Sequence, residues 1–250
     1  MSDISINEVT ASGAPFRIGV ALSKTFSILS SRLGSFLLLA FVPLIPVLAV
    51  TLVVVSGSQR GPLGPSAGAL GGLSGILTFV LGIVAQATTL YAAFQQMGDK
   101  PFSIGESLSV GLGRSLPVVG VALLSALGIV LAALLFLVPG IIVACMLYVA
   151  VPVCVIEKAG VFESLNRSGV LTRGYRWQIF GLLALVTIAA FIGGVVVALL
   201  GGVALWAKLL SFGWQVVTTA FGAVLAAVVY HDLRVAKEGI DIDDLANVFD

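Results

Sequence analysis

The sequence predicts an all-α integral membrane protein with six transmembrane helices. Of its 250 residues, 59% are hydrophobic and only 10% are charged, and the mean hydropathy is +1.15. A soluble domain carries roughly 25% charged residues, so a chain this poor in charge cannot cover its own surface in water. Two further observations support this prediction: six long apolar runs, and Lys and Arg residues gathered on one side of them.

Six apolar runs reach or approach the roughly 20 residues that cross a bilayer. The third and fourth lie within one uncharged stretch, 117–156, which as a single helix would be about 60 Å long, twice the hydrocarbon thickness. Pro139 cannot continue the hydrogen bonds of a helix, and Gly140 can adopt the angles of a reversal. We therefore expect a hairpin that turns at Val138-Pro139-Gly140. The predicted spans are 35–55, 71–95, 117–137, 140–156, 179–203 and 209–230.

The positively charged residues predict the orientation of these spans. Of the 13 Lys and Arg residues, all but Arg60 and Lys208 flank the spans on one side. Because Lys and Arg are retained on the cytoplasmic side, both termini are predicted to be cytoplasmic.

Three stretches that precede the odd-numbered spans resemble one another. They begin at Pro15, Pro101 and Lys158 and align without gaps. In the second, Ser103 and Glu106 have the spacing of a capping box, which marks a helix start. The same stretch has an apolar stripe with a four-residue period, as on one face of a helix. The stripe is Ile104, Leu108, Leu112 and Leu116, and the aligned triplets are Ala21-Leu22-Ser23, Ser107-Leu108-Ser109 and Ser164-Leu165-Asn166.

These stretches predict three amphipathic helices that lie on the cytoplasmic surface of the membrane. Each is followed by a pair of spans, so the chain is predicted to be a threefold internal repeat within a single membrane domain, 1–250. The repeat units are 15–97, 101–156 and 158–231, followed by an acidic cytoplasmic tail, 232–250.

Span five carries small residues at four-residue spacing, which allow a neighbouring backbone to approach closely. We expect this stripe to pack against span six, with a homodimer face as the alternative. Pro43 and Pro46 lie inside span one and are expected to bend it, which frees carbonyls near residues 39 to 42. The bent helix either packs against its neighbours or lines a cavity. The stripe is Ala190, Gly194, Ala198 and Gly202.

The six runs contain no Asp, Glu, Lys, Arg or His. Ion-coupled transport usually places an ionisable group within the membrane, so this absence argues against a proton- or sodium-driven carrier. A catalytic metal needs two or three ligands at fixed spacing, and His231 is the only histidine, so no metal, cofactor or enzymatic activity is expected. Asp232 is a candidate to pair with Arg167 or Arg173, while His231 with Asp232 is the least favoured catalytic pair.

The segment 137–181 resembles the membrane domain attached to some glycerophosphodiester phosphodiesterases and the related bacterial YciC-like inner-membrane proteins. The resemblance covers most of the chain from residue 100 onward and the first amphipathic stretch. In the phosphodiesterases, a separate soluble barrel with His and acidic metal ligands carries the chemistry. The resemblance therefore implies the membrane part only, without a catalytic barrel. The matching residues are Pro139-Gly140, Pro152, Glu157, Ser164 with Ser168, Arg173-Gly174 with Trp177, and the closing "YHDLRVAKEGIDIDDL".

The sequence thus predicts a non-enzymatic structural or accessory membrane protein. Its expected partners are membrane lipids, with another membrane protein or a second copy of the chain as further candidates. The formal net charge of +1 excludes nucleic-acid binding by phosphate neutralisation. The alternative is a passive transporter or channel for a neutral or apolar solute. The residues expected to contact lipid headgroups or a partner are Arg17, Lys24, Arg32, Arg114, Arg167, Arg173 and Arg176.

Overall fold

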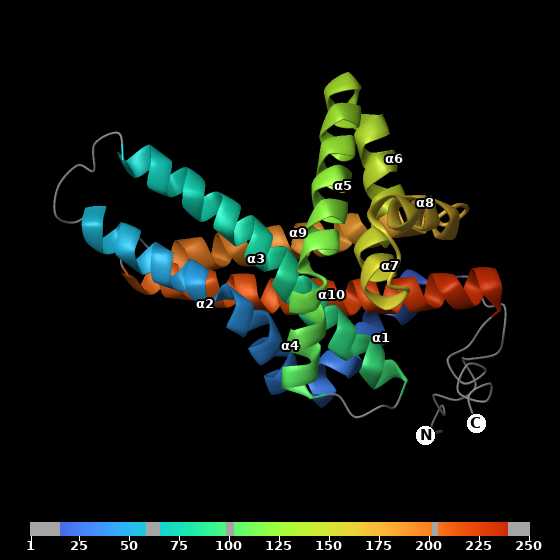
Figure 1. The fold of residues 1–250 in the computed structure, drawn as a ribbon, viewed down its shortest axis with the longest axis horizontal. Coiled ribbons are helices and arrows are strands. Elements are labelled where there is room, and N and C mark those ends of the chain that lie inside the picture. Colours follow the sequence, from blue (N-terminus) through green and yellow to red (C-terminus); the bar gives the residue numbers. More distant parts are fainter. Residues whose placement is uncertain (1–15, 59–65, 99–102, 202–204, 240–250) are drawn as a thin grey trace.

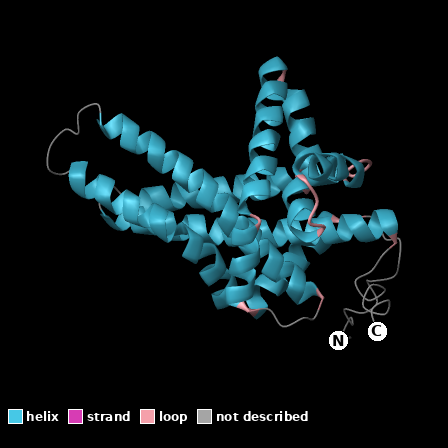
Figure 2. Cartoon of the chain, in the orientation of Figure 1, coloured by secondary structure: helices cyan, strands magenta, loops and turns pink. Residues whose placement is uncertain are grey.

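The computed structural model describes residues 16–58, 66–98, 103–201 and 205–239 (Figure 1). Within these ranges the chain is helical and contains no strand (Figure 2). Six helical segments are long and apolar enough to cross a membrane, which confirms the predicted all-helical, multi-pass class. They are α2 (Leu33–Ser58), α3 (Ser66–Met97), α5 (Ser115–Leu135), α6 (Leu137–Leu147) together with α7 (Ala150–Ile156), α9 (Arg176–Gly201) and α10 (Leu205–Glu238).

The long helices form three hairpins, α2–α3, α5–α6 and α9–α10. The α5–α6 hairpin diverges from the other two in Figure 1, whereas α2 and α3 both pack against α10. We call these hairpins the arms. The three short helices α1 (Ile18–Ser31), α4 (Ile104–Gly113) and α8 (Val161–Leu171) lie with α7 where the arms converge. We call this region, with the adjoining ends of α3, α9 and α10, the base. The larger of two buried apolar clusters includes residues of α1, α3, α7 and α10 in the base.

The second helix of each hairpin is the more buried one. In the most apolar parts of α3, α6–α7 and α10, 39%, 44% and 50% of residues are buried, against 33%, 11% and 6% in α2, α5 and α9. The helices α3, α7 and α10 also contact one another. The centre of the molecule is therefore built from even-numbered spans, and the odd-numbered spans lie outside them.

The hairpin between spans three and four is present, but it turns earlier than predicted. Helix α5 ends at Leu135, Phe136 has extended backbone angles (φ −161°, ψ 150°), and α6 begins at Leu137. Pro139 lies in the first turn of α6, where a missing N–H is tolerated. A Cβ at Gly140 would lie 2.7 Å from Ala133 Cβ, so glycine here allows the two helices to approach closely rather than making the turn.

Span four is interrupted at Tyr148 and Val149, which lie between the end of α6 and the start of α7. Pro152 is the third residue of α7, and its missing N–H cannot bond to the Tyr148 carbonyl. The break therefore lies where the proline removes a helical hydrogen bond. The α5–α6 arm leaves the base at this break, steeply inclined to α10 in Figure 1.

The two prolines of span one lie inside the continuous helix α2. Pro43 frees the carbonyl of Leu39 four residues earlier, as predicted. The Thr88 hydroxyl on α3 lies 3.3 Å from this carbonyl oxygen and 2.9 Å from that of Ala85. Both Leu39 and Thr88 are fully buried, so the freed acceptor is used in packing α2 against α3.

The predicted small-residue stripe of span five is only partly used. Ala190 and Gly194 are half-buried, Ala198 is exposed, and Gly202 lies outside the described residues. The closest approach to span six comes from Gly193, where a Cβ would overlap the ring of Trp214 on α10. The Trp214 ring on α10 thus fills the space that the small side chain of Gly193 leaves on α9.

The three short helices begin at equivalent positions of the ungapped alignment, Ile18, Ile104 and Val161. The predicted cap is present at the second: the Ser103 hydroxyl accepts a hydrogen bond from the Glu106 N–H at 3.1 Å. In each helix, small residues at aligned positions are buried. These are Ala21 and Thr25 in α1, Ser107 and Gly111 in α4, and Ser164 and Ser168 in α8.

Each short helix packs against an even-numbered span. Helix α4 contacts α3, α8 contacts α6 and α7, and α1 contacts α10. The same order relates the spans, because α3 contacts α5, α6 contacts α9, and α10 contacts α2. The contacts that α1 and α2 make with α10 therefore match the contacts that each group of one short helix and two spans makes with the next group along the chain.

Candidate functional site at the charged base

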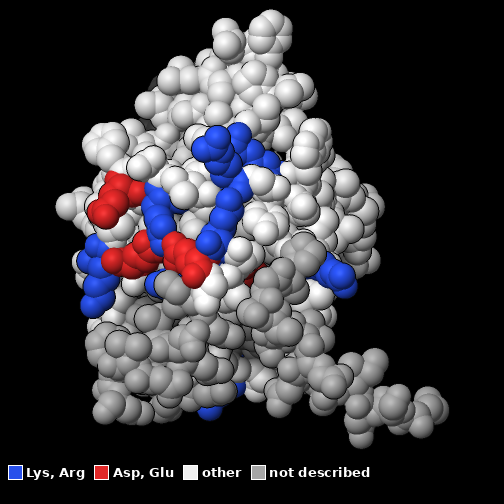
Figure 3. All heavy atoms as spheres, turned by 90° about the vertical axis from the view of Figure 1, so that its right-hand side faces the viewer, with Lys and Arg blue, Asp and Glu red and all other residues white. Residues whose placement is uncertain are grey.

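Most charged side chains of the described residues gather at one end of the molecule. Figure 3 faces the end at which α9 begins and α10 finishes, and shows Lys, Arg, Asp and Glu side chains close together there. Lys208 lies near the start of α10, at the opposite end of that helix. Arg60, Lys100 and residues 240–250 of the predicted tail lie outside the described residues, whereas residues 232–238 continue α10 rather than forming a tail.

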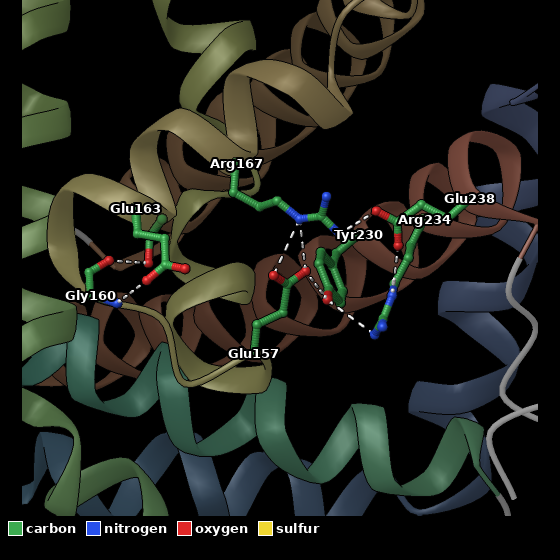
Figure 4. Close-up of polar contacts among 8 residues, drawn as sticks. Glu157, Gly160, Glu163, Arg167, Tyr230, Arg234 and Glu238 are labelled. Atoms are coloured by element: carbon green, nitrogen blue, oxygen red, sulfur yellow. Dashed lines mark hydrogen bonds and ion pairs between the residues drawn. The ribbon is translucent and has the colours of Figure 1, made fainter. Parts of the chain in front are cut away.

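Glu157 is the centre of this charged base (Figure 4). It caps the C-terminus of α7, and its carboxylate accepts a 2.8 Å hydrogen bond from the Tyr230 hydroxyl on α10. The Nε of Arg167 on α8 donates to the same carboxylate at 3.2 Å. One carboxylate thus joins three helices, with only 22% of the Glu157 side chain exposed.

Arg167 is shared between two carboxylates. Its guanidinium also donates to Glu238 at the end of α10, and the Nε of Arg234 reaches Glu238 at 3.2 Å. Burial lowers the pKa of Arg167, but the charges of Glu157 and Glu238 outweigh burial and raise it. The charge of Arg167 is therefore balanced within the protein, which weakens the prediction that it contacts anionic headgroups.

Asp232 forms its ion pair with Lys24 on α1, at 3.0 Å, rather than with Arg167 or Arg173 as predicted. His231 Nδ1 lies 3.4 Å from the same carboxylate, and the Asp232 side chain is 14% exposed. Lys24 is consequently occupied in holding α1 to α10. The pair connects the start of the chain to the last span.

The remaining predicted contact residues have different surroundings. Arg114 donates from Nη1 to the Cys154 carbonyl at 3.0 Å and so braces α7. Arg17, Arg32 and Arg173 are exposed, and Arg32 has contacts of its own. The Nε of Arg176 is buried without a hydrogen-bond partner in the described part of the chain. The seven cations are therefore not equivalent, and only some can offer charge to a ligand.

The described residues contain no group of three His, Cys, Asp or Glu side chains that could hold a metal ion. Cys145 and Cys154 are both free and buried. Around Glu157 and Asp232 the base instead presents paired charges and hydroxyls whose partners are other groups of the protein. Such an arrangement fixes α1, α7, α8 and α10 relative to one another.

Tyr230 and Glu157 are the residues whose roles the sequence reasoning missed. Tyr230 ends a predicted span, a position typical of an interfacial tyrosine, yet it is fully buried and bonded to Glu157. Glu157 is the first charge after the long uncharged stretch 117–156, and that position is the only local signal. Its partners lie on other helices, at sequence separations that no local pattern reveals.

Comparison with family models, with curated proteins and with solved structures finds no match to this chain. The resemblance to YciC-like proteins and to phosphodiesterase membrane domains accordingly stays a prediction.

Proposed function

We propose that this protein is a non-enzymatic structural or accessory protein of the bacterial inner membrane. It contacts lipid headgroups or a partner protein through its basic cytoplasmic face. The observation that carries the proposal is the orientation of the three short helices. They bury small residues against the bundle and turn large apolar side chains outward.

The outward faces are unsuited to water. Phe26 on α1 is 60% exposed, Leu112 on α4 is 52% exposed and Phe162 on α8 is 78% exposed. In water such faces are unfavourable, whereas at a membrane surface they are buried among acyl chains while the charged residues beside them reach the headgroups. Small residues on the buried face and large apolar residues on the exposed face support an interfacial position for α1, α4 and α8.

We further propose that the fold is a threefold internal repeat that closes on itself. The equivalent helix starts, the aligned buried residues and the docking of α1 on α10 support this. The even-numbered spans supply another shared feature, since an alanine precedes a tyrosine by four residues in each. The pairs are Ala87 with Tyr91, Ala144 with Tyr148, and Ala226 with Tyr230.

The position of the charges supports cytoplasmic termini. Every described Lys and Arg except Lys208 lies in or beside α1, α4 or α8, at the start of α9 or near the end of α10, and the positive-inside tendency then favours a cytoplasmic base. The alternative of a passive path lined by α2 receives less support. The carbonyl that Pro43 frees is bonded within the protein by Thr88 instead of facing a solute.

The proposal is tested by the lipid preference of the purified protein. In native mass spectrometry from mild detergent, the wild-type chain is expected to retain phosphatidylglycerol over phosphatidylcholine when both are supplied equally. Equal retention of the two lipids, with no protein partner co-purifying, contradicts the proposal.

The interfacial position of the short helices has its own test. A spin label on Leu112→Cys in a lipid nanodisc is expected to be relaxed more strongly by lipid-dissolved oxygen than by a water-soluble nickel complex. The opposite ranking places α4 in water and removes the support that its apolar face provides.

A further inference from the structure

The corner between α8 and α9, residues Arg173–Trp177, gathers the ends of three helices. The ring of Tyr175 lies edge-on to Phe16, with centroids 6.3 Å apart, and Phe16 comes just before α1. Lys237 Nζ, in the last turn of α10, lies 6.0 Å from the Tyr175 centroid. The corner therefore brings together the start of α1, the start of α9 and the end of α10.

Four cations belong to this corner: Arg17, Arg173, Arg176 and Lys237. Within the described ranges, none of the four forms an ion pair with a carboxylate. Arg17, Arg173 and Lys237 are exposed, while Arg176 has a buried Nε that lacks a hydrogen-bond acceptor. The corner thus combines uncompensated positive charge with an unsatisfied donor.

The corner is also open and lies beside an exposed indole ring. Gly174 has φ +94°, and a Cβ built there would meet no atom within 4 Å. Trp177 is 83% exposed and packs edge-on to Phe180, with ring centroids 6.1 Å apart. A tryptophan in the first turn of a span is typical of the headgroup level of a bilayer.

We propose that the α8–α9 corner binds the phosphate group of an anionic phospholipid. Arginine forks match the geometry of phosphate oxygens, and Arg173 and Arg176, which flank Gly174 in the sequence, supply two of them. The exposed Trp177 ring lies against the glycerol and upper acyl region. This assignment rests on the proposed function and narrows it from the whole basic face to one corner.

The test compares two doubly substituted proteins of equal charge. Arg173→Gln with Arg176→Gln removes the corner arginines, whereas Lys158→Gln with Lys208→Gln removes two exposed cations elsewhere. Native mass spectrometry in mild detergent measures retained phosphatidylglycerol relative to phosphatidylcholine. The corner variant is expected to lose about fivefold in preference for each arginine removed, and the control variant is expected to stay within about twofold.

The single substitution Arg173→Gln protects the test against a folding defect. Arg173 is exposed and has no ion pair in the described structure. The thermal unfolding midpoint of the Arg173→Gln variant is therefore expected to match that of the wild type. A loss of lipid preference in this variant therefore reports on binding. Equal losses in the corner and control doubles would show diffuse attraction to the whole surface and overturn the proposal.

A soluble anion shares the phosphate chemistry, and Trp177→Ala separates the two sources. A lipid site loses phosphatidylglycerol when the indole is removed, and millimolar inorganic phosphate does not displace the lipid from the wild type. Displacement by inorganic phosphate together with unchanged lipid binding in Trp177→Ala would overturn the lipid assignment.

Failure of this inference can be told from failure of the proposed function. If the wild type prefers phosphatidylglycerol and the variant without both corner arginines keeps that preference, only this inference is overturned. If the wild type shows no preference between the two lipids, the result counts against the proposed function.

Discussion

The base and the arms differ in what surrounds an apolar side chain. In the base, Leu182 and Leu233 are fully buried among other side chains. At the tip of the α5–α6 arm, Leu134, Phe136 and Leu137 are each at least 70% exposed. The base therefore has an internal core, whereas the arm depends on lipid to cover its surface.

The two regions also differ in how they use polar groups. The base holds Glu157, Arg167 and Tyr230 in one network, and the six apolar runs that form the arms carry no charge. Lipid offers no hydrophobic force between helices, so packing and hydrogen bonds must hold them together. We infer that the polar network of the base fixes how the α5–α6 arm is placed, whereas the α2–α3 and α9–α10 arms also share a smaller buried apolar cluster of their own.

The largest effect is expected from Glu157→Ala. It leaves the Tyr230 hydroxyl without its carboxylate acceptor and leaves Arg167 with Glu238 alone. Loss of one partner of a largely buried ion pair is expected to lower the free energy of unfolding by about 3 kcal/mol. Thermal unfolding in detergent measures the change.

Glu163→Ala is the matched control on the neighbouring helix. Among the described residues its carboxylate accepts only the Gly160 N–H, at 3.2 Å, and its loss is expected to cost about 0.5 to 1 kcal/mol. Similar losses in the two variants would mean that the Glu157 network does not hold the base together.

The next effect contrasts two leucines on α9. Leu182 is fully buried in the base, and Leu185 is 52% exposed on the arm. Leu182→Ala is expected to cost about 2 kcal/mol through the cavity that it leaves, whereas Leu185→Ala stays within about 0.5 kcal/mol. Unfolding in a titration with sodium dodecyl sulfate compares them. Equal costs would show that the arm is packed as tightly as the base.

A smaller effect is expected where α4 meets α3. A Cβ at Gly111 would overlap Thr88 Cγ2, whereas a Cβ at Gly113 meets nothing within 4 Å. Gly111→Ala is expected to destabilise by about 1 to 2 kcal/mol through overpacking. Gly113→Ala, on the same helix, is expected to be neutral or slightly stabilising. A tolerated Gly111→Ala would show that α4 can move away from α3.

Local sequence patterns predicted the helices well and their partners poorly. The six apolar runs and the Ser103 cap depend on neighbouring residues, so composition and spacing were enough to find them. The reversal at Phe136 was misplaced because proline and glycine often mark turns, while here Pro139 lies in the first turn of a helix and Gly140 packs against Ala133.

The charged base shows why the rest could not be predicted. Several predicted helices carry cations that could pair with Asp232. Its pairing with Lys24 depends on the docking of α1 against α10. That docking brings together residues 208 positions apart. The sequence therefore identified which residues carry charge, but not that Arg167 is balanced while Arg173 is not.

The smallest effect is expected from the ion pair that closes the base. A double-mutant cycle with Lys24→Gln and Asp232→Asn is expected to give a coupling energy of about 0.5 to 1 kcal/mol, since the Lys24 side chain is 39% exposed and partly screened by water. The coupling should shrink in 1 M salt, because screening acts on an exposed partner. Lys208→Gln at the other end of α10 provides a control without a pair in the described structure. A coupling energy of zero at low salt would mean that apolar contacts alone, such as Phe26 with Phe221, hold α1 to the last span.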